Sequence, residues 1–163
     1  MEFLDELIKQ EIENLVVPGM TYAIVENDDL NIGSVGYKSL VPNKEKVEND
    51  TIYDIASLTK VVVTMPLVLK LIGQNKLQFN DKLKTYLPSF KYDDITIYHL
   101  LTHTSGLPAD VDSKEISSKK EMLDKIYTME KEYETGSKVL YSDLGYIFLG
   151  EMLEKIYGAN YDK

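Results

Sequence analysis

A long apolar segment that begins beside a serine and a lysine constrains the fold of this chain most strongly. A helix that is apolar on nearly all sides is normally buried in a protein core. Ser57 and Lys60 stand three residues apart at its start, and side chains at this spacing share one face of a helix. The segment therefore predicts a buried helix with a hydroxyl and an amine in contact at its entrance. It runs from Leu58 to Ile72, and its polar residues are Thr59, Lys60, Thr64 and Lys70.

A serine beside an amine can act as a nucleophile, because the amine can accept the hydroxyl proton. Burial and the positive end of the helix dipole should both lower the pKa of Lys60 and favour the neutral amine that a base requires. The alternative is a lysine that extends into solvent from a helix end and has no chemical role. The residues of this segment alone do not decide between the two.

The Ser-x-x-Lys spacing is weak evidence by itself. With 10 serines and 18 lysines in 163 residues, chance gives about one match, and a second match occurs at Ser117 and Lys120. There, Ser118 and Glu121 predict a capping box at the start of a helix, which is a structural role.

The composition excludes several classes of function. A net charge of −9 and the absence of arginine argue against nucleic acid and anionic membranes as partners. The absence of cysteine excludes disulfides and thiol catalysis. No apolar run has membrane-spanning length, since Thr64 and Pro66 interrupt the longest. The acidic N-terminus does not resemble a signal peptide, so the chain as written is expected in the cytoplasm, or outside it if a leader has been removed.

Periodicity and turn residues predict helices around a short hairpin. Ser142 or Asp143 is expected to cap the last helix, Gly73 and Gly158 to end helices, and Pro66 to interrupt the apolar helix. The expected helices are 2–16, 58–72, 95–102, 119–133 and 144–157, and the expected strands are 20–25 and 30–37, with a polar loop at 39–50, a β-like segment at 51–55 and a short element of undefined type at 83–87.

Four sequence blocks resemble, in the same order, the serine β-lactamase-like hydrolases of the class C type. This family includes class C β-lactamases, D-alanyl-D-alanine carboxypeptidases and related esterases. The third block is the longest and the most specific. The blocks are Ala56-Ser57-Leu58-Thr59-Lys60, residues 76–81 with Tyr86-Leu87-Pro88, residues 95–108 ending in His103-Thr104-Ser105-Gly106-Leu107-Pro108, and residues 136–146 around Tyr141-Ser142-Asp143.

The resemblance implies an α+β fold of helices around an antiparallel sheet, of which this chain would hold about two strands. It implies a hydrolase with no metal or cofactor that forms an acyl-enzyme on an ester, a β-lactam or a D-Ala-type amide. Ser57 would be the nucleophile and Lys60 its proton partner, while Tyr141 would share protons with both. The Ser57 N–H would supply half of an oxyanion hole.

The chain departs from the family pattern in two ways. Asp143 stands where the family commonly has asparagine, so a group that only accepts hydrogen bonds replaces one that also donates. It is expected to contact substrate and to raise the pKa of Lys60, although it could simply cap a helix. The family's third motif, Lys-Thr-Gly or His-x-Gly on a late strand, is absent from residues 1–163.

The expected domain is therefore a partial one, with an N-terminal region at 1–56, a helical region at 57–163, and the C-terminal strands missing. A small-molecule or peptide substrate is the expected partner. The alternative is an inactive fragment or non-catalytic module, which would cover its exposed sheet edge by self-association or with the missing part. His99 and His103 have helical spacing but lack the adjacent glutamate of a zinc protease, so both are expected to be structural.

Overall fold

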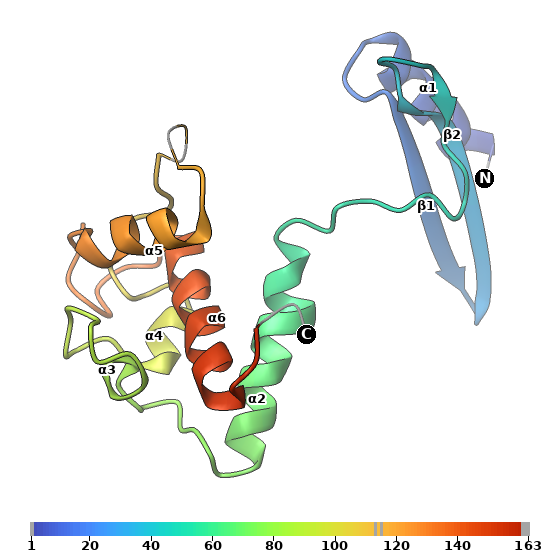
Figure 1. The fold of residues 1–163 in the computed structure, drawn as a ribbon. Helices are drawn as coiled ribbons and strands as arrows, with labels where there is room; N and C mark the ends of the chain where they lie inside the picture. The colour runs from blue at the N-terminus through green and yellow to red at the C-terminus, as the bar shows by residue number, and fades with distance from the viewer. Residues whose placement is uncertain (1, 113, 115, 161–163) are drawn as a thin grey trace. The chain divides into compact units, whose positions relative to one another are not determined.

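The computed structural model describes residues 2–112, 114 and 116–160. It forms two compact units that divide between Asp54 and Ile55 (Figure 1). The first unit contains the sheet, and the second contains most of the helices. No helix in the described part of the chain is long and apolar enough to cross a membrane.

The first unit is a β-hairpin with a helix packed on it. Helix α1 (Glu2–Glu13) contacts strands β1 (Gly19–Glu26) and β2 (Asp29–Ser39). The strands pair antiparallel in continuous register along the whole of β1. The turn places Asn27 and Asp28 at φ values of 49° and 70°, as is typical of tight turns whose twist matches a hairpin. The predicted helix and hairpin are confirmed.

The segment after the hairpin differs from its prediction in two places. The expected loop at 39–50 contains a short strand, β3 (Glu45–Lys46), that pairs with β2. The sheet of the described residues therefore has three strands, in the order β1-β2-β3, where about two were expected. The expected β-like segment at 51–55 forms no strand. Its first N–H group, on Thr51, bonds locally to the Glu48 carbonyl at 3.1 Å instead of to a neighbouring strand.

The second unit is built around helix α6 (Asp143–Tyr157). This helix contacts α2 (Met65–Gly73), α3 (Leu83–Tyr86) and α4 (Ile97–Leu101), and Figure 1 shows α2 and α6 side by side. Helix α5 (Lys119–Thr128) joins α6 through the Tyr127 hydroxyl, which donates to the Glu151 carboxylate at 2.9 Å.

The apolar face of α6 forms the centre of this unit's core. Phe148 is fully buried, and its ring packs edge-on against Phe90 and Tyr127 at centroid distances of 4.8 and 5.2 Å. Edge-to-face contacts of this kind add to the stabilisation from burial. The other fully or nearly fully buried residues of the helix are Leu144, Leu149, Met152 and Leu153.

The predicted helix ends are mostly confirmed. Gly158 ends α6 in the left-handed conformation, with φ of 66°, whereas Gly73 is the last residue of α2 and Gln74 is its cap. The Ser118 hydroxyl accepts from the Glu121 N–H at 3.2 Å and caps α5 as expected. Helix α5 nevertheless ends at Thr128, before the predicted residue 133, because the following backbone makes tertiary hydrogen bonds.

Candidate functional site

Ser57 lies in a tight turn that leads into a π-helical segment, η1 (Lys60–Thr64). Consecutive backbone N–H groups, beginning with that of Leu58, donate to carbonyls three residues earlier at 2.9–3.1 Å. Ala56, just before the serine, has φ of 44°, a strained value for a residue with a Cβ. Strained backbone and π-helical turns are both concentrated at functional sites.

The predicted helix from Leu58 to Ile72 is present, but residues 60–64 within it are π-helical. Helix α2 begins only at Met65, after η1, with Pro66 in its first turn. Proline has no N–H to donate, so it is tolerated at a helix start and not in a helix interior. The change from π-helix to α-helix therefore lies next to Pro66, where an interruption was predicted.

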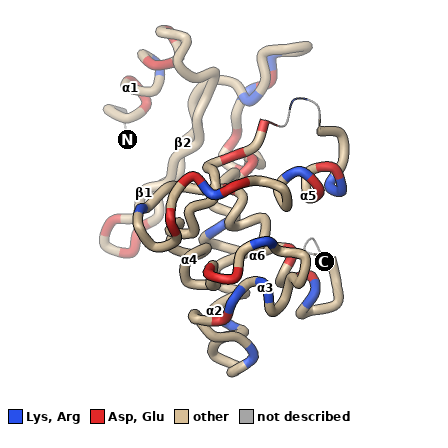
Figure 2. Tube along the Cα trace, turned by 90° about the vertical axis from the view of Figure 1, so that its left-hand side faces the viewer, with Lys and Arg blue, Asp and Glu red and all other residues tan. Residues whose placement is uncertain are grey.

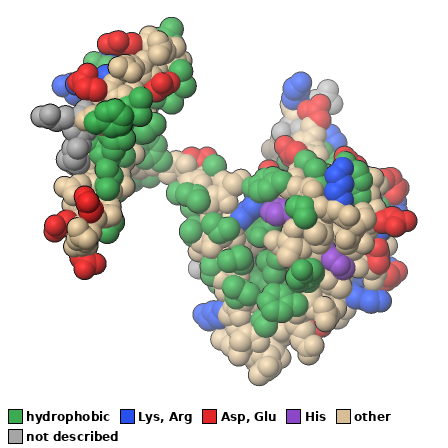
Figure 3. Space-filling view, turned by 180° about the vertical axis from the view of Figure 1, so that it is seen from behind, with side chains coloured by type: hydrophobic (Ala, Val, Ile, Leu, Met, Phe, Trp, Pro, Cys, Tyr) green, Lys and Arg blue, Asp and Glu red, His purple; other side chains and the backbone are tan. Residues whose placement is uncertain are grey.

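The prediction that this apolar run is buried on nearly all sides is wrong. Val68 and Leu71 are buried, but Val61 and Val62 are 49% and 57% exposed. Helix α6 packs against this apolar segment, and a single helix covers only one of its sides. Figure 3 shows hydrophobic side chains gathered on one face of the helical unit.

Lys60 lies in contact with the three other residues of the predicted site. Its Nζ donates to the Ser57 Oγ at 3.1 Å and lies 2.6 Å from Oδ1 of Asp143. The same Nζ lies 5.0 Å from the centre of the Tyr141 ring, within range of a cation–π contact. The structure thus brings together all four side chains that the sequence singled out. The Lys60 side chain is only 14% exposed, so it does not simply extend into solvent.

The pKa of Lys60 is raised, opposite to the direction expected from burial and the helix dipole. Burial alone would lower this pKa, but hydrogen bonds and charge interactions with Asp143 and Tyr141 together outweigh it. Lys60 is therefore an ammonium group at neutral pH. The expectation that Asp143 raises the lysine pKa is confirmed. Asp143 is not the helix cap, because the Ser142 hydroxyl accepts from the Gly145 N–H in that role.

The pKa of Tyr141 is lowered. Its hydrogen bond to Ser57 is the largest cause, followed by its hydrogen bond and charge interaction with Lys60. The ring is half exposed, so the phenol is accessible from solvent. A phenol beside an ammonium group can release its proton more easily, because the cation stabilises the phenolate.

His103, which was expected to be only structural, lies directly against this site. Its ring stacks at tilted angles against Tyr141 and Tyr146, with centroid distances of 4.6 and 5.1 Å. The Ser142 N–H donates to its Nδ1 at 3.1 Å, so this nitrogen carries no proton. Burial, and then the positive charge of Lys60, lower the His103 pKa, and the ring is neutral at neutral pH. Helical spacing to His99 gave no signal of this contact.

The loop that contains His103 holds the Tyr141 segment in place by backbone hydrogen bonds. The Leu140 N–H donates to the His103 carbonyl at 2.9 Å, and the Asp143 N–H donates to the Ala109 carbonyl at 2.7 Å. The buried Ser142 hydroxyl donates to the Pro108 carbonyl at 2.6 Å. The third sequence block, residues 95–108, therefore helps to hold the fourth, residues 136–146, in place.

We expect the stability of the folded chain to fall as the pH falls below 6.5, the ordinary histidine pKa. His103 has a lower pKa when folded, so between these two values the unfolded chain binds more protons than the folded one. Urea unfolding at about pH 7.5 and about pH 5.5 measures this loss. It should be smaller in His103→Gln, and an equal loss in both proteins would contradict the assignment.

Residues 4–163 match the family model described as Beta-lactamase. The chain belongs to the beta-lactamase family. Within this family it is 31% identical over 173 residues to Protein flp of Staphylococcus aureus (strain COL), covering 98% of this chain and 34% of that protein. It is 31% identical over 152 residues to penicillin-binding protein 4* of Bacillus subtilis (strain 168), covering 88% of this chain and 33% of that protein.

A solved class C beta-lactamase has the same fold over the matched region. The TM-score is 0.82 at 23% identity, and the match covers 98% of this chain and 45% of that one. The predicted fold, a beta-lactamase-like arrangement of helices and an antiparallel sheet, is confirmed. The chain spans about a third of the length of the curated relatives that it matches.

Proposed function

We propose that this chain carries the nucleophile of a serine hydrolase that acts through an acyl-enzyme on an ester, a β-lactam or a D-Ala-type amide. The observation that carries the proposal is the hydrogen bond of 3.1 Å from the Lys60 ammonium to the Ser57 Oγ, with Tyr141 bonded to the same two groups. A nucleophile needs a neighbouring group that takes its proton, and here a phenol that can act as the acceptor and a cation that can stabilise negative charge both contact one serine.

The raised pKa of Lys60 favours Tyr141 as the proton acceptor. In this scheme Tyr141 first releases its own proton to solvent, and the Ser57 Oγ then attacks the substrate carbonyl carbon while the Ser57 proton passes to the Tyr141 phenolate oxygen. Lys60, which stays positively charged, stabilises the negative charge on that oxygen and on the attacking Oγ. The Ser57 N–H, at the start of its turn, donates to the oxyanion that forms.

Collapse of the tetrahedral intermediate breaks the bond to the leaving group, which takes the proton from Tyr141. Water then attacks the acyl-enzyme as Tyr141 accepts a proton from it, and the acid product leaves as the proton returns to the Ser57 Oγ. Every proton transfer thus uses groups that contact Ser57. The family membership supports this scheme, as does the name of the relative penicillin-binding protein 4*, since a penicillin is a β-lactam.

Covalent labelling tests the proposal directly. The chain is incubated with a fluorescent penicillin and, separately, with a fluorophosphonate, and the adduct is mapped by mass spectrometry. We expect label on Ser57 and none in Ser57→Ala. Ser117→Ala is a matched control, because Ser117 has the same spacing to a lysine but binds Glu121 through its hydroxyl at 2.9 Å. That variant should label like the parent chain.

A second outcome would favour the non-catalytic module. The chain spans about a third of the length of its curated relatives, so a reactive serine can depend on segments outside the matched region. Absence of label from both probes on a chain that is folded by circular dichroism would contradict catalysis by residues 1–163.

A further inference from the structure

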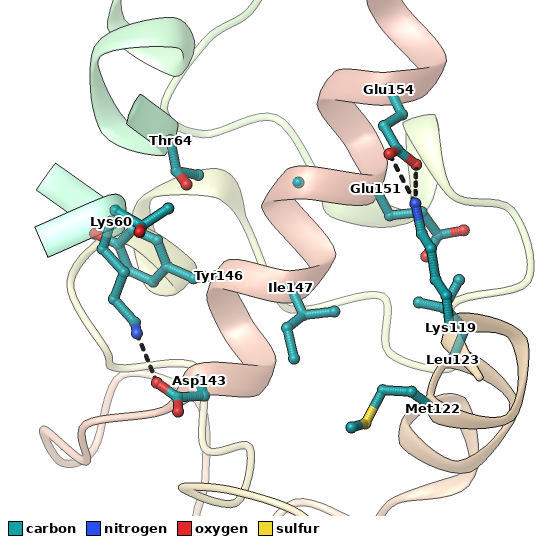
Figure 4. Close-up of a pocket in the computed structure, with 12 residues that line it drawn as sticks. Lys60, Thr64, Lys119, Met122, Leu123, Asp143, Tyr146, Ile147, Glu151 and Glu154 are labelled. Carbon is teal, nitrogen blue, oxygen red and sulfur yellow. Dashed lines mark hydrogen bonds and ion pairs between the residues drawn. The ribbon is translucent and has the colours of Figure 1, made fainter. Parts of the chain in front are cut away.

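An apolar cavity of about 400 Å³ begins at the Lys60–Asp143 pair and extends between α5 and α6 (Figure 4). All of its lining residues belong to the second unit. Its walls are Met122 and Leu123 from α5 and Ile147 from α6. At its far end, the Lys119 ammonium and the Glu154 carboxylate pair at 2.6–2.7 Å and form a polar rim. Its size and lining suit an apolar side chain of a small substrate.

Asp143 lies at the entrance to this cavity, and its two carboxylate oxygens have different surroundings. Its Oδ1 is buried and faces Lys60. The side chain as a whole is 42% exposed, so the exposed part includes atoms other than Oδ1. Figure 4 shows one carboxylate oxygen directed at Lys60 and the other directed away from it. The second oxygen can only accept hydrogen bonds, in contrast to an amide at this position.

The second carboxylate oxygen of Asp143 restricts which chemical groups of a substrate can lie beside it. Lys60 connects Asp143 to the nucleophile, because its Nζ contacts both Oδ1 and the Ser57 Oγ. A substrate whose carbonyl carbon lies at Ser57 therefore has its neighbouring groups close to Asp143. A carbonyl oxygen there would face another acceptor, whereas a protonated amine would donate a charge-assisted hydrogen bond. The net charge of −9 also favours the approach of cations.

We propose that Asp143 is a specificity-determining residue that selects esters and amides of apolar amino acids with a free, protonated amino group. This rests on the proposed hydrolase function. The ammonium group binds the free oxygen of Asp143, and the apolar side chain enters the cavity between α5 and α6. Acylation of the amine removes both the charge and two of the donors, so it weakens binding at this point.

Hydrolysis of paired substrates tests the inference. Phenylalanine methyl ester and N-acetylphenylalanine methyl ester, each as both enantiomers, are compared with the full chain. We expect a preference of about tenfold or more for the free amine in kcat/KM, the size expected for a hydrogen bond to a charged group. Asp143→Asn should lose this preference. Glycine methyl ester should react more slowly than phenylalanine methyl ester, because it leaves the cavity empty.

Asp124→Asn is the matched control, because it removes one carboxylate of the same kind from the exposed face of α5, where Asp124 pairs with Lys120. Figure 2 shows that α5 carries charges of both signs. This variant should keep the preference of the parent chain. An equal loss in both variants would show a general effect of net charge and overturn the role of Asp143.

Binding without chemistry separates this inference from the proposed function. The free amine and N-acetylated forms of phenylalaninamide are titrated into Ser57→Ala and followed by NMR. Tighter binding of the free amine that disappears on adding Asp143→Asn supports the inference even where hydrolysis is undetectable. Equal binding of the two ligands overturns it, whether or not Ser57 is labelled by the fluorophosphonate.

Discussion

Replacing Lys60 by methionine is expected to slow covalent labelling of Ser57 by a fluorophosphonate by about 10²- to 10³-fold, the usual effect of removing one group that stabilises developing negative charge. Methionine keeps most of the volume of the side chain but removes the ammonium that contacts the Ser57 Oγ and Asp143. Without this cation, the pKa of Tyr141 loses one of the causes that lower it, and the phenol becomes a poorer proton acceptor at neutral pH. The measurement is the rate of adduct formation by intact-protein mass spectrometry.

Lys70→Met is the matched control for this substitution. Lys70 lies on α2 and is exposed, so its replacement removes the same charge without touching the site. Its labelling rate should equal that of the parent chain. Lys60→Met leaves the Asp143 carboxylate without its cation, so the fold of each variant is checked by circular dichroism. A folded Lys60→Met chain that labels within threefold of the parent rate would contradict the proposed proton transfer.

Replacing Phe148 by alanine is expected to lower the free energy of unfolding by about 3–5 kcal/mol, the usual cost of removing a buried aromatic ring. Phe148 is fully buried and loses its edge-on contacts with Phe90 and Tyr127. A typical domain is stable by only about 5–15 kcal/mol, so this loss is a large share of the total. Urea unfolding followed by circular dichroism measures it.

Phe79→Ala supplies the comparison for the core substitution. Phe79 belongs to the same unit but is 43% exposed, so its removal creates a smaller cavity. We expect a loss of about 1 kcal/mol, since much of the ring is already in contact with water. Equal losses for the two phenylalanines would show that α6 does not organise the core as described.

The hairpin and the helix starts were predictable because local residues determine them. Residues that favour strands at 20–25 and 30–37, with the turn residues Asn27 and Asp28 between them, define the hairpin, and the structure confirms it. The Ser118 cap depends on a hydrogen bond across three residues, which the sequence shows directly. The order of four motif blocks identified the family, and the match over residues 4–163 confirms it.

The electrostatics of the site depended on contacts between residues that are distant in sequence. Burial and a helix dipole predicted a neutral Lys60, whereas Asp143, 83 positions later, raises its pKa through a contact of 2.6 Å. His103 showed no sign of its position between the Tyr141 and Tyr146 rings. Local patterns report backbone conformation and burial over a few residues. The charge state of Lys60 was decided by tertiary structure, because its contacts with Asp143 and Tyr141 together outweigh the effect of burial.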